Sequence, residues 1–338
     1  MQWPPLEFSP AEHEAFDAAL AGLLTPLGRP LVAALAREHF ATGGKRLRAR
    51  LAAGAGRALG VAPERVRGWA LACEILHNAT LVHDDLQDGD TQRRGQPTLW
   101  VRHGMAQAIN VGDWLFMRSL AAVDEAPGLT ADERLALQRG LRHALEAVID
   151  GQTQECGFRG GELVTPERYA AMVRGKTAAL FALPVWGAAL LAGRAPAECD
   201  GLAASFAELG ELFQWADDVV DVFGDKQREA PAQDLYEGKM SALVVTHAAR
   251  VPGDAAFLRE LLQTPREQTP AADVARARAA FVDAGTLRAA LGQIDRLARR
   301  ARGHCHAELA AVQEALLQAI CGPLVALEAR PVEAAHVG

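Results

Sequence analysis

Apolar residues recur every three to four positions through most of the chain, which is the spacing of one buried face of an α-helix. Short polar segments with Gly, Pro or a Ser/Thr cap separate these stretches. Ser9-Pro10-Ala11-Glu12 is a capping box with Pro at the first helical position, so it predicts a helix from there to about Leu24. The pattern also predicts helices over 30–40, 70–88 and 106–122, helices that follow Thr130, Thr165, Ala197 and Ala242, and caps near Thr264 and Thr269.

The longest run without a charged residue lies between Lys176 and Arg194. It is interrupted by Pro184 and is short for a bilayer span, which needs about 20 apolar residues. We therefore expect a buried helix here and no transmembrane segment. The first residues lack a basic start followed by an apolar core, so no export signal is expected and a cytoplasmic location is predicted.

Composition supports an all-α fold. Half of the 338 residues are hydrophobic but only 6% are aromatic, and strong helix formers such as Ala, Leu, Arg and Glu dominate. No linker is long enough to divide the chain, so one all-helical domain over residues 1–338 is predicted. The net charge of -7 argues against nucleic acid as a partner. Five scattered cysteines without a C-x-x-C pair favour a reducing compartment over disulfides or a zinc site.

Two acidic motifs of the form D-D-x-x-D each end an apolar helical stretch. Their members are Asp84, Asp85, Asp88, Asp217, Asp218 and Asp221. In each motif the first and last aspartates are four residues apart and share a helix face, where like charges repel. A Mg²⁺ ion held by carboxylates and substrate phosphates would offset that repulsion. One such motif is typical of a solvated helix end, but two, each in apolar sequence where unpaired charge is costly, favour a metal site.

Basic residues lie in positions that suit phosphate. Gly43-Gly44-Lys45-Arg46-Leu47-Arg48 is a glycine turn that opens a helix with three cations, and helix starts offer unpaired N–H groups to anions. A basic surface turn is the alternative. Arg93 and Arg94 follow the first acidic motif in a Gly- and Pro-containing loop, where their planar forks suit bidentate phosphate contacts. Only four lysines occur in the chain, and three lie in the stretches singled out as candidate sites: Lys45, Lys176 and Lys239.

These motifs together resemble the trans-isoprenyl (polyprenyl) diphosphate synthases, over roughly residues 30 to 250. The matching stretches are 43–48, 74–88, 93–95, 107–113, 151–152, 176–177, 213–221 and 238–239. The resemblance implies an all-α isoprenoid synthase fold, a large helical bundle around a central cavity, and a homodimer. It also implies head-to-tail condensation of isopentenyl diphosphate with an allylic diphosphate, assisted by Mg²⁺.

The resemblance also implies roles for individual residues. By analogy Asp84, Asp88 and Asp217 ligate Mg²⁺, with Asp85, Asp218 and Asp221 in support. Lys176 helps to stabilise the leaving diphosphate and so counts among the catalytic residues. The family's isopentenyl diphosphate ligands match Lys45, Arg48, His77 and Arg94. Its allylic diphosphate ligands match Arg93, Lys176, Thr177, Gln214 and Lys239.

The sequence departs from the family after the second acidic motif. The loop there looks about two residues shorter, and the lysine usually found in it is missing, with Lys226 as a candidate substitute. Glu155 stands where the family often has Asp, which is a mild change.

Product length is predicted from the helix that ends in Asp84. In the family, large side chains four or five residues before this aspartate stop chain growth early, whereas here Thr80 and Ala79 are small. Leu76 lies one turn further back, then Cys73 and Trp69. A product of twenty carbons or more is expected, and Ala79→Phe should shorten it.

Three alternatives remain. A terpene cyclase shares the fold, but its second metal motif normally mixes Asn, Ser and Glu. A non-catalytic subunit of a heteromeric prenyl synthase would typically have lost one acidic motif. A purely structural helical protein would leave the clustered aspartates and phosphate-type cations without a purpose.

Overall fold

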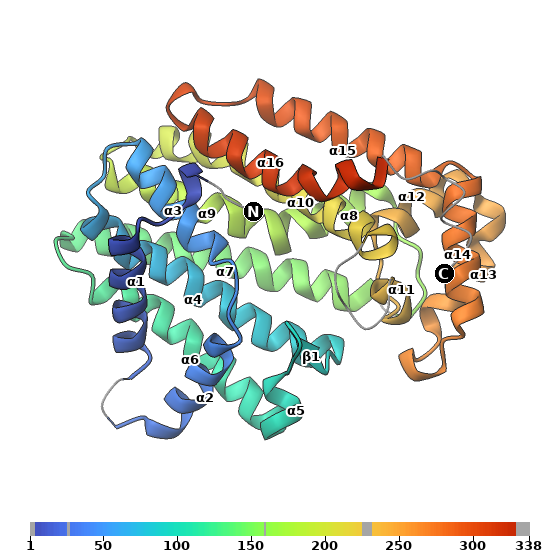
Figure 1. Ribbon diagram of the computed structural model, residues 1–338, viewed down its shortest axis with the longest axis horizontal. Helices are drawn as coiled ribbons and strands as arrows, with labels where there is room; N and C mark the ends of the chain where they lie inside the picture. Colours follow the sequence, from blue (N-terminus) through green and yellow to red (C-terminus); the bar gives the residue numbers. More distant parts are fainter. Residues whose placement is uncertain (1–3, 26–27, 159, 225–231, 329–338) are drawn as a thin grey trace.

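Helices make up nearly all of the secondary structure in this computed structural model, which describes residues 4–25, 28–158, 160–224 and 232–328 (Figure 1). The first half of the chain contains η1 (Pro4–Leu6), α1 (Pro10–Leu23), α2 (Pro30–Ala41), α3 (Leu47–Ala58), α4 (Pro63–Asp88), β1 (Gln92–Arg93), β2 (Gln96–Pro97), α5 (Leu99–His103), α6 (Met105–Asp124) and α7 (Ala131–Phe158). The all-α fold expected from the sequence is confirmed.

The second half continues the same architecture around the long helix α10. Its elements are α8 (Pro166–Val173), the π-helical turn η2 (Arg174–Ala178), α9 (Ala179–Leu191), α10 (Pro196–Phe223), α11 (Gln233–Tyr236), α12 (Ala242–Arg250), η3 (Pro252–Asp254), α13 (Ala255–Gln263), η4 (Arg266–Gln268), α14 (Ala271–Asp283), α15 (Thr286–Gly303), η5 (Ala307–Leu309) and α16 (Ala310–Glu328).

Local capping signals begin several helices where the sequence predicts them. At the start of α1 the Glu12 carboxylate accepts the Ser9 N–H at 2.7 Å, and the Ser9 hydroxyl accepts the Glu12 N–H at 3.3 Å. Thr130 and Glu133 form the same reciprocal pair before α7. Thr264 caps the end of α13, and Thr269 immediately precedes Pro270, the N-cap of α14.

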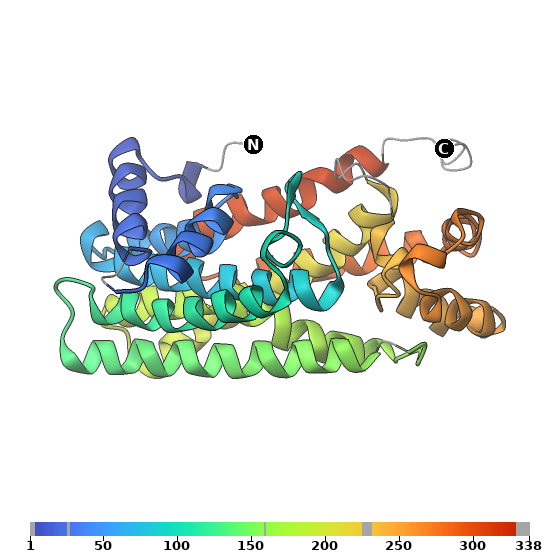
Figure 2. The same ribbon diagram turned by 90° about the horizontal axis from the view of Figure 1, so that it is seen from below.

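The core consists of two groups of buried side chains. One gathers around α10, α12, α15 and α16, and the other around α1, α4, α6 and the inner face of α7. Trp186 and Leu190 of α9 pack against both groups, so α9 lies between them. Figure 2 shows α7 extended along one side of the molecule, with α6 beside it.

The buried helix expected between Lys176 and Arg194 is present: α9 continues through Pro184, after the π-helical turn that carries Lys176 and Thr177. The loop after α4 forms a two-residue hairpin, β1–β2, which then leads into the unexpected helix α5. The hairpin and α5 are not visible in the periodicity, because these elements are shorter than the window that reveals a period.

One segment among the described residues, Ala307–Val325, is long and apolar enough to cross a membrane by length and composition. It lies in the chain region of η5 and α16, and 44% of it is buried against the rest of the fold. Core helices of this kind pass the same test, so the expectation that no helix spans a membrane stays a prediction.

Candidate active site

A polar cavity of about 120 Å³ brings the two acidic motifs together. Helix α4 supplies one motif at its C-terminal end and α10 supplies the other, so segments more than a hundred residues apart face one space. The predicted site residues that line it are Asp84, Asp88, Arg93, Lys176, Gln214, Asp217, Asp218 and Lys239. Carboxylates are disfavoured at a helix C-terminus, where the macrodipole is negative, so both helix ends favour a cation nearby.

The first acidic motif divides into two roles. Asp88 and Asp84 face the cavity, where Asp88 pairs with Lys239 at 2.7 Å and Asp84 lies 3.9 Å from the Lys176 ammonium. Asp85 turns away, is almost fully buried, and accepts hydrogen bonds from the Arg93 guanidinium at 2.5 Å. Burial raises the pKa of Asp85 to about 7, although Arg93 acts in the opposite direction. Burial also raises the pKa of Asp84.

The second motif divides in the same way. Asp218 is buried and accepts hydrogen bonds from the Tyr169 hydroxyl at 2.5 Å, the Ala242 N–H at 2.6 Å and the Gln214 amide at 2.8 Å. Burial raises its pKa to about 6, while these three donors act to lower it. Asp221 is buried as well and accepts the N–H of Asp234 at 3.0 Å. Asp218 and Asp221 therefore hold the backbone at Ala242 and Asp234, and Asp217 lines the cavity together with Asp218.

Two lysines hold positive charge inside the cavity. The Lys176 ammonium donates to Glu155, and the Lys239 ammonium contacts both Asp88 and Glu237 at 2.7 Å. Burial lowers the pKa of Lys176, but Asp84 and Glu155 outweigh burial and raise its pKa above the usual value. The pKa of Lys239 is raised in the same way by Asp88 and Glu237 against burial. Both ammonium groups are therefore charged near neutral pH.

The donor set fits a hard divalent cation. Carboxylate oxygens from α4 and α10 line one small cavity, and oxygen is the ligand that Mg²⁺ and Ca²⁺ prefer. Among the described residues, no three His, Cys, Asp or Glu side chains lie close enough to hold a metal by themselves. Mg²⁺ usually needs only one or two carboxylates plus phosphates of a ligand, so these residues fit a metal that bridges protein and diphosphate.

Thr177 and Gln214 connect the lysine turn to the second motif. The Thr177 hydroxyl donates to the Gln214 side-chain carbonyl at 2.8 Å, and the Gln214 amide donates onward to Asp218. This chain of hydrogen bonds orients both side chains between η2 and α10. Gly151 makes the arrangement possible, because a Cβ there would lie only 2.4 Å from the backbone nitrogen of Lys176.

A second polar region beside the cavity is rich in cations. Arg48 is buried and His77 is partly buried, and the buried atoms Arg48 Nε and His77 Nδ1 have no hydrogen-bond partner among the described atoms. Burial lowers the pKa of Arg48 to about 10. Burial lowers the pKa of His77, and the positive charges of Arg48, Arg93 and Arg94 lower it further. The three arginines are therefore near His77. Buried polar atoms without partners are costly, so an anionic ligand here would stabilise them.

The glycine turn before α3 lies against this cationic region. Arg94 donates to the Gly43 carbonyl, and a Cβ at Gly44 would lie 2.7 Å from the Arg94 guanidinium. Gly44 also has φ +132°, which side-chain-bearing residues rarely adopt. Lys45 is exposed beside this turn. The predicted isopentenyl diphosphate ligands thus come from α3, α4 and the β1–β2 hairpin.

The residues expected to control product length are all buried on α4: Ala79 at 0%, Leu76 at 1% and Thr80 at 7% exposure. Thr80 is four residues from Asp84 and shares its face of α4. Ala79 is four residues from His83, whose ring fills the space over Gly112 of α6, so Ala79 faces α6. Their effect on product length stays a prediction.

Several residues of the site were not identified from the sequence. Tyr169 holds Asp218 and Glu237 holds Lys239, while Glu155, noted from the sequence only as a mild change, holds Lys176. Arg266, which the sequence analysis did not single out, lies 3.3 Å from Asp90 and 3.2 Å from Glu237, and it donates to Gln233 at 2.7 Å. Tyr169 lies two helical turns before Lys176, so its spacing from that lysine could have marked it as a site residue. No local sequence pattern marks Arg266. Lys226 lies outside the described residues.

Comparison with known proteins gives a consistent picture. A family model described as polyprenyl synthetase matches residues 29–280. A geranylgeranyl diphosphate synthase from Saccharolobus solfataricus is 37% identical over 213 residues, 61% of this chain and 63% of that protein, so the match spans less than two thirds of that relative. A geranylgeranyl diphosphate synthase from Mycobacterium tuberculosis is 35% identical over 283 residues, 82% of this chain and 79% of that protein.

Solved structures show the same architecture. The crystal structure of a polyprenyl synthetase from Streptomyces coelicolor A3(2) aligns with a TM-score of 0.82 at 28% identity, covering 92% of this chain and 97% of that one. A polyprenyl synthase from Caulobacter crescentus CB15, in complex with calcium and isoprenyl diphosphate, aligns with a TM-score of 0.79 at 28% identity, covering 91% and 93%.

Proposed function

The chain belongs to the polyprenyl synthetase family, and on that basis we propose that it condenses isopentenyl diphosphate head-to-tail with an allylic diphosphate. One observation carries the proposal. Two acidic helix ends face a single cavity that also holds two charged lysines, an arrangement suited to a metal-bridged diphosphate.

We propose Mg²⁺ as the metal, held by Asp84, Asp88 and Asp217. When bound, Mg²⁺ supplies Lewis-acid stabilisation of charge on a departing diphosphate. The protein's own part is to bind and orient the allylic diphosphate through Arg93, Lys176, Thr177, Gln214 and Lys239. The calcium and isoprenyl diphosphate in the Caulobacter crescentus structure support a divalent cation together with a prenyl diphosphate.

The isopentenyl diphosphate is assigned to the cationic region of Lys45, Arg48, His77 and Arg94. The unpartnered Arg48 Nε and His77 Nδ1 support this assignment, because a diphosphate oxygen would accept hydrogen bonds from buried groups that otherwise lack one. The allylic carbon and the double bond then meet between the two sites. The buried face of α4 below Asp84 keeps water away from the allylic cation.

We propose a product of twenty carbons or more, in line with the names of the relatives. Two alternatives are less favoured. A class I terpene cyclase would not need a second D-D-x-x-D motif, and a non-catalytic subunit of a heteromeric synthase would not need both acidic motifs at one cavity.

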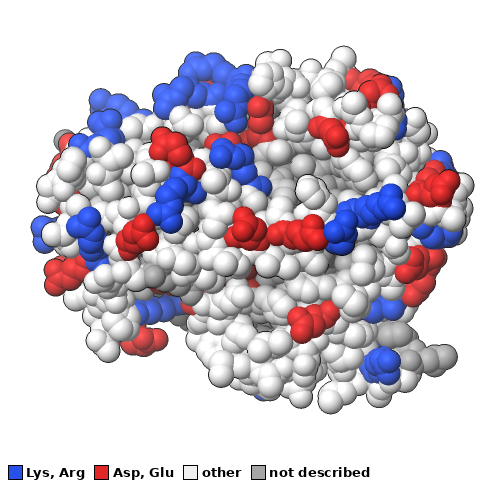
Figure 3. Space-filling model, turned by 180° about the vertical axis from the view of Figure 1, so that it is seen from behind, with Lys and Arg blue, Asp and Glu red and all other residues white. Residues whose placement is uncertain are grey.

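We further propose that the protein acts as a cytoplasmic homodimer. Exposed apolar side chains on the outer faces of α6 and α7 support self-association: Met105, Ile109, Met117, Leu135 and Ile149. Large apolar groups in contact with water are more stable when another surface covers them. Nucleic acid is not expected as a partner, because on the face in Figure 3 acidic and basic side chains are interspersed.

The test is incubation of purified protein with Mg²⁺, labelled isopentenyl diphosphate and each of three allylic primers of increasing length. Transfer of label into organic solvent after dephosphorylation is expected, and chromatography of the extract gives the chain length. Asp217→Asn should lower the rate at least a hundredfold, by analogy with the loss of other preorganised charge stabilisation. No extractable label with any primer would rule out the synthase activity.

A further inference from the structure

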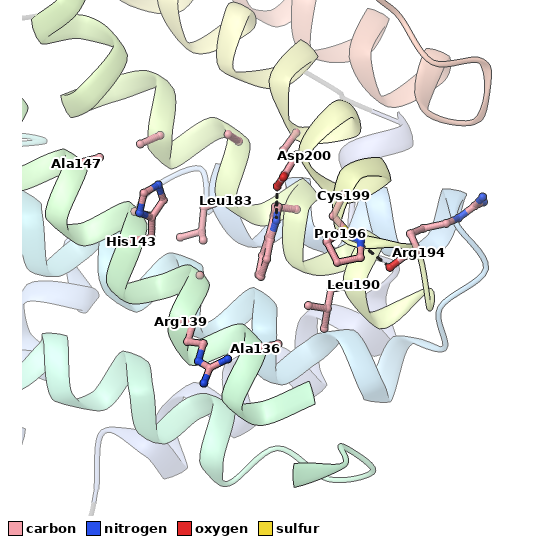
Figure 4. Close-up of a pocket in the computed structure, with 16 residues that line it drawn as sticks. Ala136, Arg139, His143, Ala147, Leu183, Leu190, Arg194, Pro196, Cys199 and Asp200 are labelled. Carbon is pink, nitrogen blue, oxygen red and sulfur yellow. Dashed lines mark hydrogen bonds between the residues drawn. The ribbon is translucent and has the colours of Figure 1, made fainter. Parts of the chain in front are cut away.

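An open groove of about 550 Å³ lies between α7, α9 and α10 and shares no described lining residue with the polar cavity (Figure 4). Its wall is mostly apolar, and Arg139, His143 and Asp200 at its rim are exposed. Charged side chains in contact with water cost the fold little. A charged group removed from water is a different case, because the contacts that it makes must offset its burial. Glu74 of α4 is such a group, with 4% of its surface exposed.

The Glu74 carboxylate is held between α3 and α4. Its Oε2 atom accepts the backbone N–H of Ala49 at 3.3 Å, and its Oε1 atom accepts the Asn78 side-chain amide at 3.2 Å. The Arg46 guanidinium lies 3.9 Å from Oε1 and supplies the opposite charge. Ion pairs in a protein interior stabilise a fold little better than apolar side chains of similar volume. Glu74 is therefore better explained by the groups that it holds than by a gain in overall stability.

The first turn of α3 receives a cap from Glu74. The N-cap residue of α3 is Arg46, which makes no side-chain cap hydrogen bond among the described residues and has a left-handed φ of 50°. The Arg50 N–H donates to the Arg46 carbonyl, so the N–H groups of residues 47–49 precede the intrahelical hydrogen bonds. Glu74 accepts the last of these three from the neighbouring helix. A negative charge at this end of a helix is also favoured by the macrodipole.

Glu74 lies beside residues assigned to isopentenyl diphosphate. Arg48 immediately precedes Ala49 on α3, and His77 is three residues after Glu74 on α4, where it is a neighbour on the helix surface. Burial lowers the pKa of Arg48 and of Arg94, and the negative charge of Glu74 acts against that shift in both. The Glu74 carboxylate is therefore close to the start of α3 and to the cationic region at the same time.

We propose that Glu74 is a positioning residue for isopentenyl diphosphate. It holds the first turn of α3 and the Arg46 guanidinium against α4, so that Arg48 and His77 meet the diphosphate from fixed positions. Groups that are already in place bind a ligand at a lower cost in conformational entropy. This inference rests on the proposed synthase function and adds to it a residue that acts on one substrate site through its neighbours.

Glu74→Gln tests the proposal directly, because the two side chains have nearly the same shape. Glutamine has one acceptor oxygen, so either the Ala49 N–H or the Asn78 amide loses its partner. We expect KM for isopentenyl diphosphate to rise about tenfold, while KM for the allylic diphosphate stays within about twofold of wild type. Steady-state kinetics with each substrate varied in turn, and calorimetric titration of isopentenyl diphosphate into the protein, measure the change.

Three results would overturn the proposal. Unchanged binding of isopentenyl diphosphate by a folded Glu74→Gln protein would show that the carboxylate positions nothing. Tighter binding would show that Glu74 acts on the diphosphate only by charge repulsion. An equal rise in KM for both substrates would show a general loss of structure.

Val66→Ala is the matched control, because it loosens the same pair of helices at its other end. Val66 is 3% exposed on α4, and a Cβ on Gly56 of α3 would lie 2.9 Å from its methyl group. The shorter side chain should lower the thermal transition, as truncation of a buried residue does, and leave both KM values near wild type. If Val66→Ala raises KM for isopentenyl diphosphate as much as Glu74→Gln does, the effect comes from packing and the proposal is wrong.

Arg46→Lys keeps the test decisive if Glu74→Gln shows no cooperative thermal transition. The Arg46 guanidinium donates to the Phe40 carbonyl at 3.2 Å and also faces Glu74. Lysine keeps the positive charge but lacks the planar fork that reaches both groups. KM for isopentenyl diphosphate should rise roughly threefold, with KM for the allylic diphosphate unchanged. Unchanged KM values in Arg46→Lys would mean that only the charge of Arg46 matters, which contradicts the proposal.

These outcomes differ from failure of the proposed function. If the wild type incorporates no label with any primer, the synthase assignment fails, and the calorimetric titration still compares isopentenyl diphosphate binding by the wild type and Glu74→Gln. If the wild type makes product but Glu74→Gln does not separate the two KM values, only the role of Glu74 is wrong. A wild type that neither forms product nor binds isopentenyl diphosphate contradicts both.

Discussion

Neighbouring aspartates of the same motif differ in what surrounds them. Asp85 is buried and accepts hydrogen bonds from Arg93, and Asp218 is buried and accepts them from Tyr169, Gln214 and the Ala242 backbone. Asp84, Asp88 and Asp217 line the cavity, which Asp218 reaches as well. A D-D-x-x-D motif therefore combines aspartates that face the cavity with aspartates that anchor the surrounding structure, and a sequence alone does not say which aspartate does which.

Arg266 extends this anchoring to Lys239. Its guanidinium contacts Glu237 and Asp90, and Glu237 holds the Lys239 ammonium. Arg266→Gln should raise KM for the allylic diphosphate roughly fivefold while KM for isopentenyl diphosphate stays near wild type. That change corresponds to about 1 kcal/mol, the upper range for a partly exposed ion pair. Steady-state kinetics with each substrate varied in turn measures the split.

Arg259→Gln is the matched control for Arg266, because Arg259 is an exposed arginine on α13 with no recorded hydrogen bond or ion pair among the described residues. It should leave both KM values unchanged. Equal effects on both substrates in Arg266→Gln would show that Arg266 stabilises the fold in general and does not position Lys239.

His39 makes the free energy of unfolding depend on pH. It is buried and its Nε2 lies 3.2 Å from the Asn78 side-chain oxygen. Burial, and then the charge of Arg93, lower its pKa to about 3 from 6.5. Because the unfolded state takes up the proton first, the folded state loses stability as pH falls from 6.5 towards 3, by up to about 1.4 kcal/mol per pH unit.

His39→Asn removes this term. Denaturant unfolding at several pH values should show the free-energy difference between wild type and variant shifting in favour of the variant as pH falls below 6.5. Above pH 7 the difference should be constant. A difference that does not change between pH 7 and pH 4 would mean that His39 is not held neutral in the fold.

At the scale of single elements, α4 combines three tasks along its length. Its last turn carries the acidic motif, its middle carries His77 and Thr80, and Trp69 near its start meets α9. Thr80→Phe places a ring one turn below Asp84, so it should shorten the product to fifteen carbons or fewer. Chromatography of dephosphorylated products measures this.

Ala79→Phe is also expected to shorten the product, but at a larger cost in stability. Ala79 is fully buried and faces α6, so a larger side chain there overpacks the helix pair, typically by about 1–3 kcal/mol. The two variants therefore differ in thermal stability. Normal product length in a stable Thr80→Phe protein would refute the prediction that the growing product extends along α4.

Long elements were predictable from the sequence and tertiary contacts were not. The helices ending in Asp88 and near Asp221 follow from sustained apolar periodicity, and Ser9 and Thr130 mark helix starts by local capping chemistry. Arg266 reaches the site only because folding brings it next to Asp90, which lies more than 170 residues earlier in the chain. Trp186 likewise contacts Gly140, Asp200 and Trp69, which lie on three other helices. No local sequence pattern encodes such contacts between residues far apart in the chain.

At the scale of the whole molecule, the polar site lies where the two core groups meet. Helix α4 belongs to one group and α10 to the other, and α9 packs between them. The cavity geometry therefore depends on how the two halves are held together. A second protein surface packed against the outer faces of α6 and α7 would hold α4 in place, because α6 is the main packing partner of α4.

We expect the α6–α7 apolar surface (Met105, Ile109, Met117, Leu135 and Ile149) to pack against the same surface of a second copy of the chain. A charged group in this surface would be buried without a partner on dimerisation, which is costly. Ile109→Glu combined with Met117→Glu should therefore convert the protein from dimer to monomer in sedimentation velocity at micromolar concentration, with lower activity. Val325→Glu, at a more exposed apolar residue of α16, should leave the mass unchanged. A double variant that still sediments as a dimer would exclude this surface as the interface, and a monomeric wild type would exclude the homodimer itself.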